Sequence, residues 1–169
     1  MKFYSGQGDD GSSHLLHSGK RSKSELIFDA LGAIDEASAF LSLAALHIKD
    51  EELNNILAQI QQDLYYLMAE LAGDEKNSLS GERISWLEEK INSWGKEVEL
   101  PADFIHSWKN PASALLNIAR TVVRRAERTT VGCFEKKQIE NSEILSYLNR
   151  LSSLIYVLQL YLENISVGK

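Results

Sequence analysis

The sequence predicts an all-α fold, an antiparallel bundle of five helices of which four are long. Two observations support this fold class. Apolar residues recur at spacings of three and four along most of the chain, a pattern typical of amphipathic helices. No segment alternates apolar and polar residues with period two over a useful length, so no sheet is expected. A chain of 169 residues is also long enough to bury the core of one such domain.

Punctuating residues divide the periodic pattern into its helices. Gly73 is a suitable stop for the second helix. Asn110 and Pro111 form a favourable helix start, because Asn caps a helix well and Pro fits the first helical position. The stretch 130–141 contains Gly132 and is expected to be a loop. The five helices are therefore expected at about residues 24–49, 51–72, 81–94, 111–129 and 142–164.

Composition restricts the classes of partner. The chain has a formal net charge of -6 and a pI near 5.3, which argues against general binding of nucleic acid or of an anionic membrane. Cys133 is the only cysteine, so no internal disulfide can form. No apolar run approaches the ~18 residues of a membrane span, and residues 1–23 lack the apolar stretch of a signal peptide. A cytoplasmic protein is therefore expected.

The expected fourth helix carries a basic stripe. At ~3.6 residues per turn, one side of it contains Arg120, Arg124, Glu127 and Arg128, and Arg125 lies just outside. We call this stripe the arginine ridge. Its cations repel one another by roughly a few tenths of a kcal/mol per pair unless an anion lies among them. Guanidinium forks match phosphate oxygens, so a polyphosphate site is one interpretation. The other is a solvated helix face with an internal Glu–Arg ion pair.

Residues 1–23 precede the helical pattern and form a glycine-rich arm, separate from the single bundle domain of residues 24–169. The arm has the letters of the G-x-G-x-x-G motif, but not the preceding buried strand or the βαβ pattern of a dinucleotide-binding turn. Its unhindered N–H groups and hydroxyls can fold around an anion; the other interpretation is an unstructured terminus. The residues concerned are Ser5, Gly6, Gly8, Asp9, Gly11, Ser12 and Ser13.

The residues present exclude the di-iron chemistry that is common in helical bundles. A di-iron carboxylate site needs Glu-x-x-His pairs on facing helices, and no Glu stands three residues before any of the four histidines. His14 and His17 share the arm without Cys or carboxylate partners at metal-ligand spacing. We therefore interpret His14 and His17 as two unrelated polar residues, and the metal ligands stay unknown.

The arm, the arginine ridge and the last expected helix carry motifs that occur together. The motifs are Ser5-Gly6-Gln7-Gly8-Asp9-Asp10-Gly11-Ser12-Ser13, Lys23, Gly32-Ala33-Ile34-Asp35-Glu36, Gln62-Asp63-Leu64, Arg124-Arg125-Ala126-Glu127-Arg128 and Leu148-Asn149-Arg150-Leu151-Ser152. In this order, and at about these separations, they resemble the ATP:cob(I)alamin adenosyltransferases of the propanediol-utilisation (PduO) type. The likeness runs over almost the full length of the chain.

The resemblance implies a homotrimer of five-helix bundles that binds ATP and cobalamin between subunits. Residues corresponding to Lys23, Arg124, Arg128 and Asn149 would contact ATP. The glycine-rich arm would close over the triphosphate, and Mg²⁺ would accompany the phosphates.

The resemblance also implies roles for residues around the nucleotide. Glu127 would hold the arginines in place, and Arg125 is counted with the nucleotide-binding residues. Asp35 and Arg120 would pair near the subunit interface. Phe104 would face the lower side of the corrin ring.

The implied reaction is an adenosyl transfer. Co(I) attacks the 5′ carbon of ATP, triphosphate leaves, and adenosylcobalamin is formed. The cobalt supplies the nucleophile, while the protein supplies positioning and stabilises the charge of the leaving triphosphate. An arginine ridge and an anion-wrapping arm suit that task.

Four positions or segments depart from the family pattern. The stretch Ser107-Trp108-Lys109 replaces a Pro-Gly-Gly beside the corrin, and Ser153 and Leu160 replace an Asp and an Arg. Ser5 replaces the first Thr of the loop and keeps its hydroxyl. Three hypotheses follow. The chain is an active corrinoid adenosyltransferase, a non-catalytic ATP- or corrinoid-binding relative that acts as carrier or regulator, or a helical interaction bundle whose arginines make only ion pairs. The intact motifs of the arm and ridge favour the first.

Overall fold

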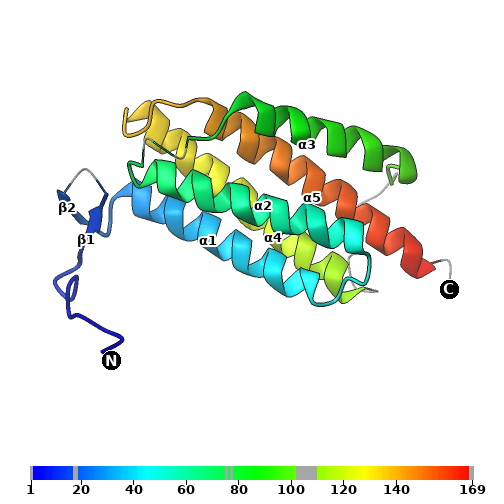
Figure 1. The fold of residues 1–169 in the computed structure, drawn as a ribbon, viewed down its shortest axis with the longest axis horizontal. Coiled ribbons are helices and arrows are strands. Elements are labelled where there is room, and N and C mark those ends of the chain that lie inside the picture. Colours follow the sequence, from blue (N-terminus) through cyan, green and yellow to red (C-terminus); the bar gives the residue numbers. More distant parts are fainter. Residues whose placement is uncertain (1, 17–18, 75, 77, 102–109, 168–169) are drawn as a thin grey trace.

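The computed structural model describes residues 2–16, 19–74, 76, 78–101 and 110–167 of the chain. Helices carry most of these residues and form an elongated bundle (Figure 1). The all-α fold class is therefore confirmed. The described residues include the α-helices α1 (Leu26–Ala45), α2 (Glu51–Leu71), α3 (Gly81–Trp94), α4 (Pro111–Glu135) and α5 (Glu143–Val167), and a 3-10 turn, η1 (Gly95–Glu97).

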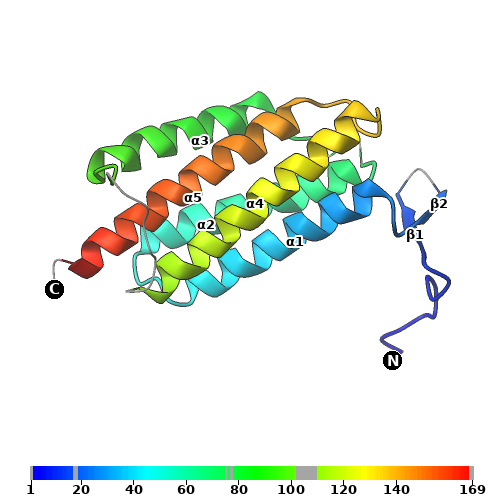
Figure 2. The same ribbon diagram turned by 180° about the vertical axis from the view of Figure 1, so that it is seen from behind.

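The other helices pack around α4 and its neighbours. α4 contacts both α1 and α5, while α2 packs on α1 and α3 packs on α5. Figures 1 and 2 show that α1, α3 and α5 run in one direction and that α2 and α4 run in the other. These contacting pairs are thus antiparallel, as predicted, except α3 and α5, which lie parallel. None of the described helices has the apolar length that a membrane crossing requires.

The predicted helix start and stop signals are confirmed. The Asn110 side chain accepts a hydrogen bond from the Ala112 N–H at 2.9 Å, and Pro111 is the first helical residue of α4. α2 ends at Leu71, and Gly73 follows with a φ of 98°, a left-handed conformation that glycine adopts without steric cost.

The prediction of a loop over residues 130–141 is wrong for residues 130–135, because α4 continues to Glu135. Gly132 is not a helix breaker here but a packing position. A Cβ added to it would lie 2.5 Å from the Leu26 Cδ2 of α1, so a larger residue here would require the Leu26 side chain to move. The chain leaves the helix instead at Lys137, which has a left-handed φ of 55°.

The arm contains a small hairpin, so the expectation of no sheet is wrong for this segment. β1 (Ser12–Leu15) and β2 (Gly19–Ser22) pair antiparallel. Each strand has four residues, and of these only Leu15 packs against the hydrophobic core. The strands therefore lack the alternating apolar pattern that would reveal them in a sequence.

A buried polar network joins α2, α3 and α5. Asp63 of α2 is 2% exposed, and Arg83 of α3 donates to its two carboxylate oxygens at 2.7–3.0 Å. The Tyr147 hydroxyl of α5 donates to Asp63 Oδ2 at 2.9 Å. Burial raises the pKa of the Tyr147 phenol well above its ordinary value, and the negative charge of Asp63 raises it further. The buried carboxylate thus has the partners that a desolvated charge requires.

Removal of this carboxylate should destabilise the bundle more than removal of one hydrogen bond to it. Asp63→Ala leaves Arg83 without its partner, and we expect the free energy of unfolding to fall by about 3 kcal/mol. This loss is at the lower end of the range for breaking a buried ion pair, because 26% of the Arg83 side chain is exposed to solvent. Tyr147→Phe should cost about 1.5 kcal/mol. Urea denaturation measures both values, and equal losses would contradict the central place of Asp63.

Candidate functional site

Two guanidinium groups of the arginine ridge lie exposed on α4. Arg124 and Arg128 are one turn apart, and Arg128 Nη1 donates to the Arg124 carbonyl at 3.0 Å. Neither side chain forms an ion pair with a carboxylate in the described part of the chain. The apolar side of the same helix is buried, including Ala119, Val123 and Ala126. The predicted ridge and the predicted apolar face are both present.

Glu127 has a different partner from the one that the alternative interpretation required. Its Oε1 accepts a hydrogen bond from Asn149 Nδ2 of α5 at 2.9 Å. Within the described residues no arginine lies at ion-pair distance from it, so the internal Glu–Arg pair is not formed there. Glu127 is half-buried, on the side of α4 that meets α5. The structure therefore brings Glu127 and Asn149 together beside the two exposed arginines.

The glycine-rich loop of the arm is folded on itself rather than extended. Gly6, Gly8 and Gly11 have φ values of 75°, 87° and 78°, which point successive main-chain groups in directions that other residues rarely allow. Lys23 closes the loop: its Nζ donates to the Gly8 carbonyl at 2.8 Å, and its N–H donates to the Gly11 carbonyl at 2.9 Å. The predicted ATP-contacting lysine and glycines thus lie together.

A second contact braces this loop against the hairpin. Asp10 accepts hydrogen bonds from Lys20 Nζ at 2.5 Å and from the Ser12 N–H at 3.1 Å. The Lys20 ammonium, followed by the Ser12 hydroxyl, lowers the pKa of the Asp10 carboxyl to about 2. Both side chains of this ion pair are more than half exposed, so it contributes little to the stability of the whole chain.

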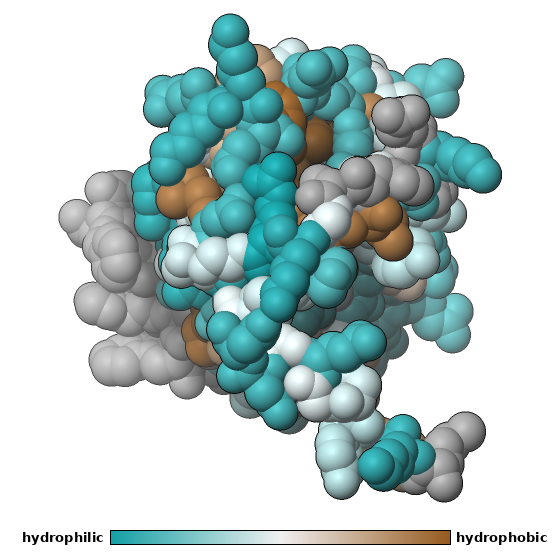
Figure 3. Space-filling model, turned by 90° about the vertical axis from the view of Figure 1, so that its left-hand side faces the viewer, coloured by the Kyte–Doolittle hydropathy of each residue, from teal (hydrophilic) through white to brown (hydrophobic). Residues whose placement is uncertain are grey.

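The arm extends beyond the end of the bundle instead of folding back over the ridge. The Leu16 N–H donates to the Ala72 carbonyl at 2.8 Å, which attaches the hairpin to the end of α2. Figures 1 and 2 show the arm extending past the end of the helices, and Figure 3, which views this end, shows a surface that is mostly hydrophilic. No hydrogen bond or ion pair between described residues joins the loop over 5–13 to Arg124 or Arg128. One chain by itself therefore does not assemble the two halves of the predicted site.

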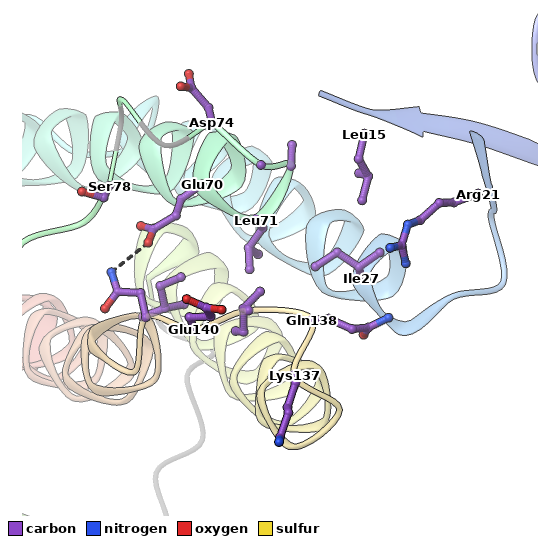
Figure 4. A pocket seen from close by; sticks show the side chains of 15 residues that line it. Leu15, Arg21, Ile27, Glu70, Leu71, Asp74, Ser78, Lys137, Gln138 and Glu140 are labelled. Carbon is purple, nitrogen blue, oxygen red and sulfur yellow. Dashed lines mark hydrogen bonds between the residues drawn. The ribbon is translucent and has the colours of Figure 1, made fainter. Parts of the chain in front are cut away.

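A cavity of about 500 Å³ lies where the hairpin meets the bundle (Figure 4). Leu15, Ile27 and Leu71 supply apolar side chains, and Glu70 accepts a hydrogen bond from Asn141 at 2.8 Å on its polar side. None of the predicted site residues lines it. The cavity is thus separate from the ridge.

Comparison with known proteins decides what this arrangement is. The profile of the protein family described as "Cobalamin adenosyltransferase" matches residues 3–162. The chain belongs to this family. The match includes both the glycine-rich arm and the arginine ridge, so the family predicted from the motifs is confirmed.

Curated relatives of this cobalamin adenosyltransferase family member carry corresponding names. "Corrinoid adenosyltransferase PduO" of Salmonella typhimurium is 35% identical over 164 residues, which are 94% of this chain and 48% of the relative. "Corrinoid adenosyltransferase" of Bacillus subtilis is 34% identical over 163 residues, 92% of this chain and 83% of the relative. The chain thus spans about half the length of the Salmonella protein and most of the Bacillus protein.

Solved structures agree with the fold. A variant of the PduO-type ATP:corrinoid adenosyltransferase from Lactobacillus reuteri, complexed with cobalamin and ATP, matches with a TM-score of 0.87 and 28% identity, over 99% of this chain and 96% of that chain. A second variant of the same enzyme, complexed with ATP, matches with a TM-score of 0.85 and 30% identity over the same shares.

Three predicted site residues of this family member do not make their predicted contacts within the described part of the chain. Arg125 is paired with Glu36 of α1, at the edge of a shallow groove between α1 and α4. Arg120 donates to Asn117 Oδ1 at 2.8 and 3.2 Å, and burial, then the charge of Arg124, lowers the pKa of its guanidinium. Asp35 is exposed on α1 and forms no ion pair within the described residues. The predicted Asp35–Arg120 pair is therefore not made inside one chain.

The predicted corrin-facing residue Phe104 and the divergent stretch 107–109 lie outside the described residues. The described part of the chain also contains no group of three or more His, Cys, Asp or Glu side chains arranged to hold a metal ion. The roles of Phe104 and of Mg²⁺ remain predictions.

Sequence reasoning missed one residue that the structure places at the site. Arg150 donates from Nη1 to Asn149 Oδ1 at 2.9 Å and from Nε to Glu88 Oε1 of α3 at 3.0 Å. Its place beside Asn149 in the Leu-Asn-Arg-Leu-Ser motif was the available signal. Its partner Glu88 could not be found in this way, because no motif includes α3.

The loop geometry predicts unequal effects for two glycine substitutions. Ala at Gly8 or Gly11 must adopt a left-handed φ, which costs about 1–2 kcal/mol. At Gly8, however, the added Cβ would also lie 2.6 Å from the Ser12 carbonyl and 3.2 Å from Lys23 Nζ, whereas at Gly11 it meets nothing within 4 Å. We expect Gly8→Ala to speed hydrogen exchange of the Lys23 amide more than Gly11→Ala does.

Gly32→Ala is the matched control for these substitutions, because Gly32 is helical and a Cβ there meets nothing within 4 Å. It should leave the Lys23 amide unchanged. Equal exchange rates in the Gly8 and Gly11 variants would show that the contact at Gly8 does not shape the loop.

Proposed function

We propose that this chain transfers the 5′-deoxyadenosyl group of ATP to cob(I)alamin, forming adenosylcobalamin and releasing triphosphate. The observation that carries the proposal is the exposed pair Arg124 and Arg128, which form no ion pair with the described residues, in a chain whose family and PduO-type neighbours are adenosyltransferases. Two cations one turn apart favour a polyanion, and the departing triphosphate is one.

In the proposed reaction the two electrons of Co(I) form the bond from cobalt to the 5′ carbon. The bond from that carbon to the triphosphate oxygen breaks, and triphosphate leaves with its electron pair. Arg124 and Arg128 would stabilise the negative charge that grows on the leaving oxygens. Lys23 and the loop N–H groups would hold the phosphates in line with the cobalt, which reduces the entropy cost of reaction.

Mg²⁺ would arrive on the phosphates rather than in a cage built by the protein. This is its usual mode in nucleotide sites, where one or two carboxylates suffice. The described residues supply Glu127 and Asp9 as exposed or half-exposed carboxylates near the ridge and in the loop respectively. Ser5, Ser12 and Ser13 add hydroxyl groups in the loop, and Arg125 adds a further cation on α4. Phe104 would face the corrin.

The site is proposed to lie between subunits of a homotrimer. Two observations support this: the arm extends past the end of its own bundle, and Asp35 and Arg120 lack each other as partners within the chain. The arm of one subunit would then meet the ridge of the next. The single cysteine, Cys133, is free and buried, which is compatible with the predicted cytoplasmic location.

Arg124→Ala and Arg128→Ala should each lower kcat/KM for ATP by about ten- to a hundredfold, because each removes a charge-assisted contact worth ~1.5–3 kcal/mol. The assay is anaerobic incubation with ATP and cob(I)alamin, read as light-sensitive adenosylcobalamin and released triphosphate. Lys96→Ala, which removes an exposed cation of η1, is the control.

This assay also tests the alternative that the chain is a non-catalytic carrier or regulator. A wild-type chain that binds ATP but forms no adenosylcobalamin would support that alternative. Activity at the wild-type level in both arginine variants would overturn the proposed site.

Assembly gives a separate test of the shared site. Asp35→Arg should place two cations together at the proposed interface and shift the trimer towards monomer, as measured by light scattering. The double variant Asp35→Arg with Arg120→Asp restores opposite charges and should restore the trimer. A stable wild-type monomer that retains activity would contradict the intersubunit site.

A further inference from the structure

Three hydrogen bonds run in series from α3, through α5, to the arginine ridge on α4. Glu88 Oε1 accepts from Arg150 Nε at 3.0 Å. Arg150 Nη1 donates to Asn149 Oδ1 at 2.9 Å. Asn149 Nδ2 donates to Glu127 Oε1 at 2.9 Å. We call these four residues the relay, and it ends at the residue next to Arg128.

The chemistry of the relay allows only one orientation of the Asn149 amide. A guanidinium can only donate hydrogen bonds, and an ionised carboxylate can only accept them. Arg150 therefore requires the amide oxygen of Asn149, and Glu127 requires its NH₂ group. If the amide turned over, a lone pair would face the Glu127 carboxylate and an NH₂ group would face the guanidinium. Both contacts would then be repulsive.

The stability of the bundle does not explain the outer pair of the relay. The side chains of Arg150 and Glu88 are 42% and 49% exposed. Ion pairs this exposed contribute little to folding, since water and salt screen them. Their effect on the direction of the Asn149 amide is not weakened in the same way, because the Arg150–Asn149 bond lies in a half-buried position.

We propose that Arg150 is a positioning residue of the ATP site, which orients Asn149 and through it Glu127, and that Glu88 supports it from α3. The inference rests on the proposed function, in which Asn149 contacts ATP. With the amide fixed, one N–H of Asn149 is used on Glu127 and the other remains for a nucleotide oxygen. Without Arg150, the amide loses the contact that holds its oxygen and is held by Glu127 alone, so its N–H groups are less well directed towards Glu127 and the nucleotide.

Arg150→Met keeps much of the side-chain length but removes the donors. We expect it to raise KM for ATP about tenfold, the usual effect of one lost hydrogen bond to a charged group, with kcat nearly unchanged. Glu88→Gln should give a smaller change in the same direction. Glu89→Gln, at the exposed neighbouring carboxylate of α3, is the matched control and should leave KM at the wild-type value.

A charge reversal separates orientation from simple bridging of α3 and α5. Glu88→Arg combined with Arg150→Glu restores an ion pair between the two helices. It also places an acceptor, not a donor, beside Asn149. If Arg150 acts through Asn149, the double variant keeps its melting temperature but retains a raised KM. Recovery of KM to the wild-type value would show that only the bridge between α3 and α5 matters, and would overturn the proposal.

A readout independent of catalysis distinguishes this proposal from the proposed function. In protein labelled with ¹⁵N-asparagine, nuclear Overhauser contacts should connect the Asn149 NH₂ protons to Glu127 in the wild type and weaken in Arg150→Met. If those contacts keep their full intensity in the variant, the orienting role is wrong whatever the activity. If they weaken while the wild-type chain shows no adenosylation, the relay holds and the proposed function fails.

Discussion

The structure depends on α4 being held by its apolar face firmly enough to keep on its surface two cations that have no ion-pair partner among the described residues. Arg124 and Arg128 repel each other by roughly a few tenths of a kcal/mol. Each large apolar side chain that α4 buries, such as Leu116 or Val123, contributes about 1.5–3 kcal/mol. Burial against α1 and α5 exceeds the repulsion by an order of magnitude. The helix therefore needs no counter-ion beside these two arginines in order to form, and the ridge remains available to a bound anion.

Periodicity and capping chemistry were sufficient to predict the bundle, because a buried apolar stripe constrains many residues at once. The start of α4 at Asn110 and Pro111 could be predicted for a different reason, because a helix cap is a local interaction. The end of α4 could not. Glycine ends helices in many proteins. At Gly132, however, the space where a Cβ would lie is filled by the Leu26 side chain of another helix, which is a tertiary contact. The hairpin escaped prediction because main-chain pairing, not an apolar pattern, holds its strands together.

At the candidate site too, the sequence predicted the residues better than it predicted their contacts. Motifs predicted which side chains belong to it, and Lys23 does lie with Gly8 and Gly11 in the folded loop. The partner of Glu127 was predicted less well. Along one helix, arginines at neighbouring positions are the obvious partners, but the half-buried side of α4 faces α5 and presents Asn149. Which helix lies opposite a residue is decided by packing of the whole bundle, and a motif does not contain that information.

Besides its apolar packing, α3 makes two guanidinium–carboxylate contacts with the rest of the bundle that differ in burial. Arg83 meets an Asp63 carboxylate that is almost wholly desolvated, so this contact constrains how α2, α3 and α5 pack. Glu88 meets Arg150 in solvent, where an ion pair stabilises little. Yet the second contact fixes the direction of a hydrogen bond that ends beside the ridge. A contact with little effect on stability but a defined effect on an amide beside two exposed cations is better explained by ligand binding than by folding. The helix that carries none of the nucleotide motifs would then shape the ATP site through α5.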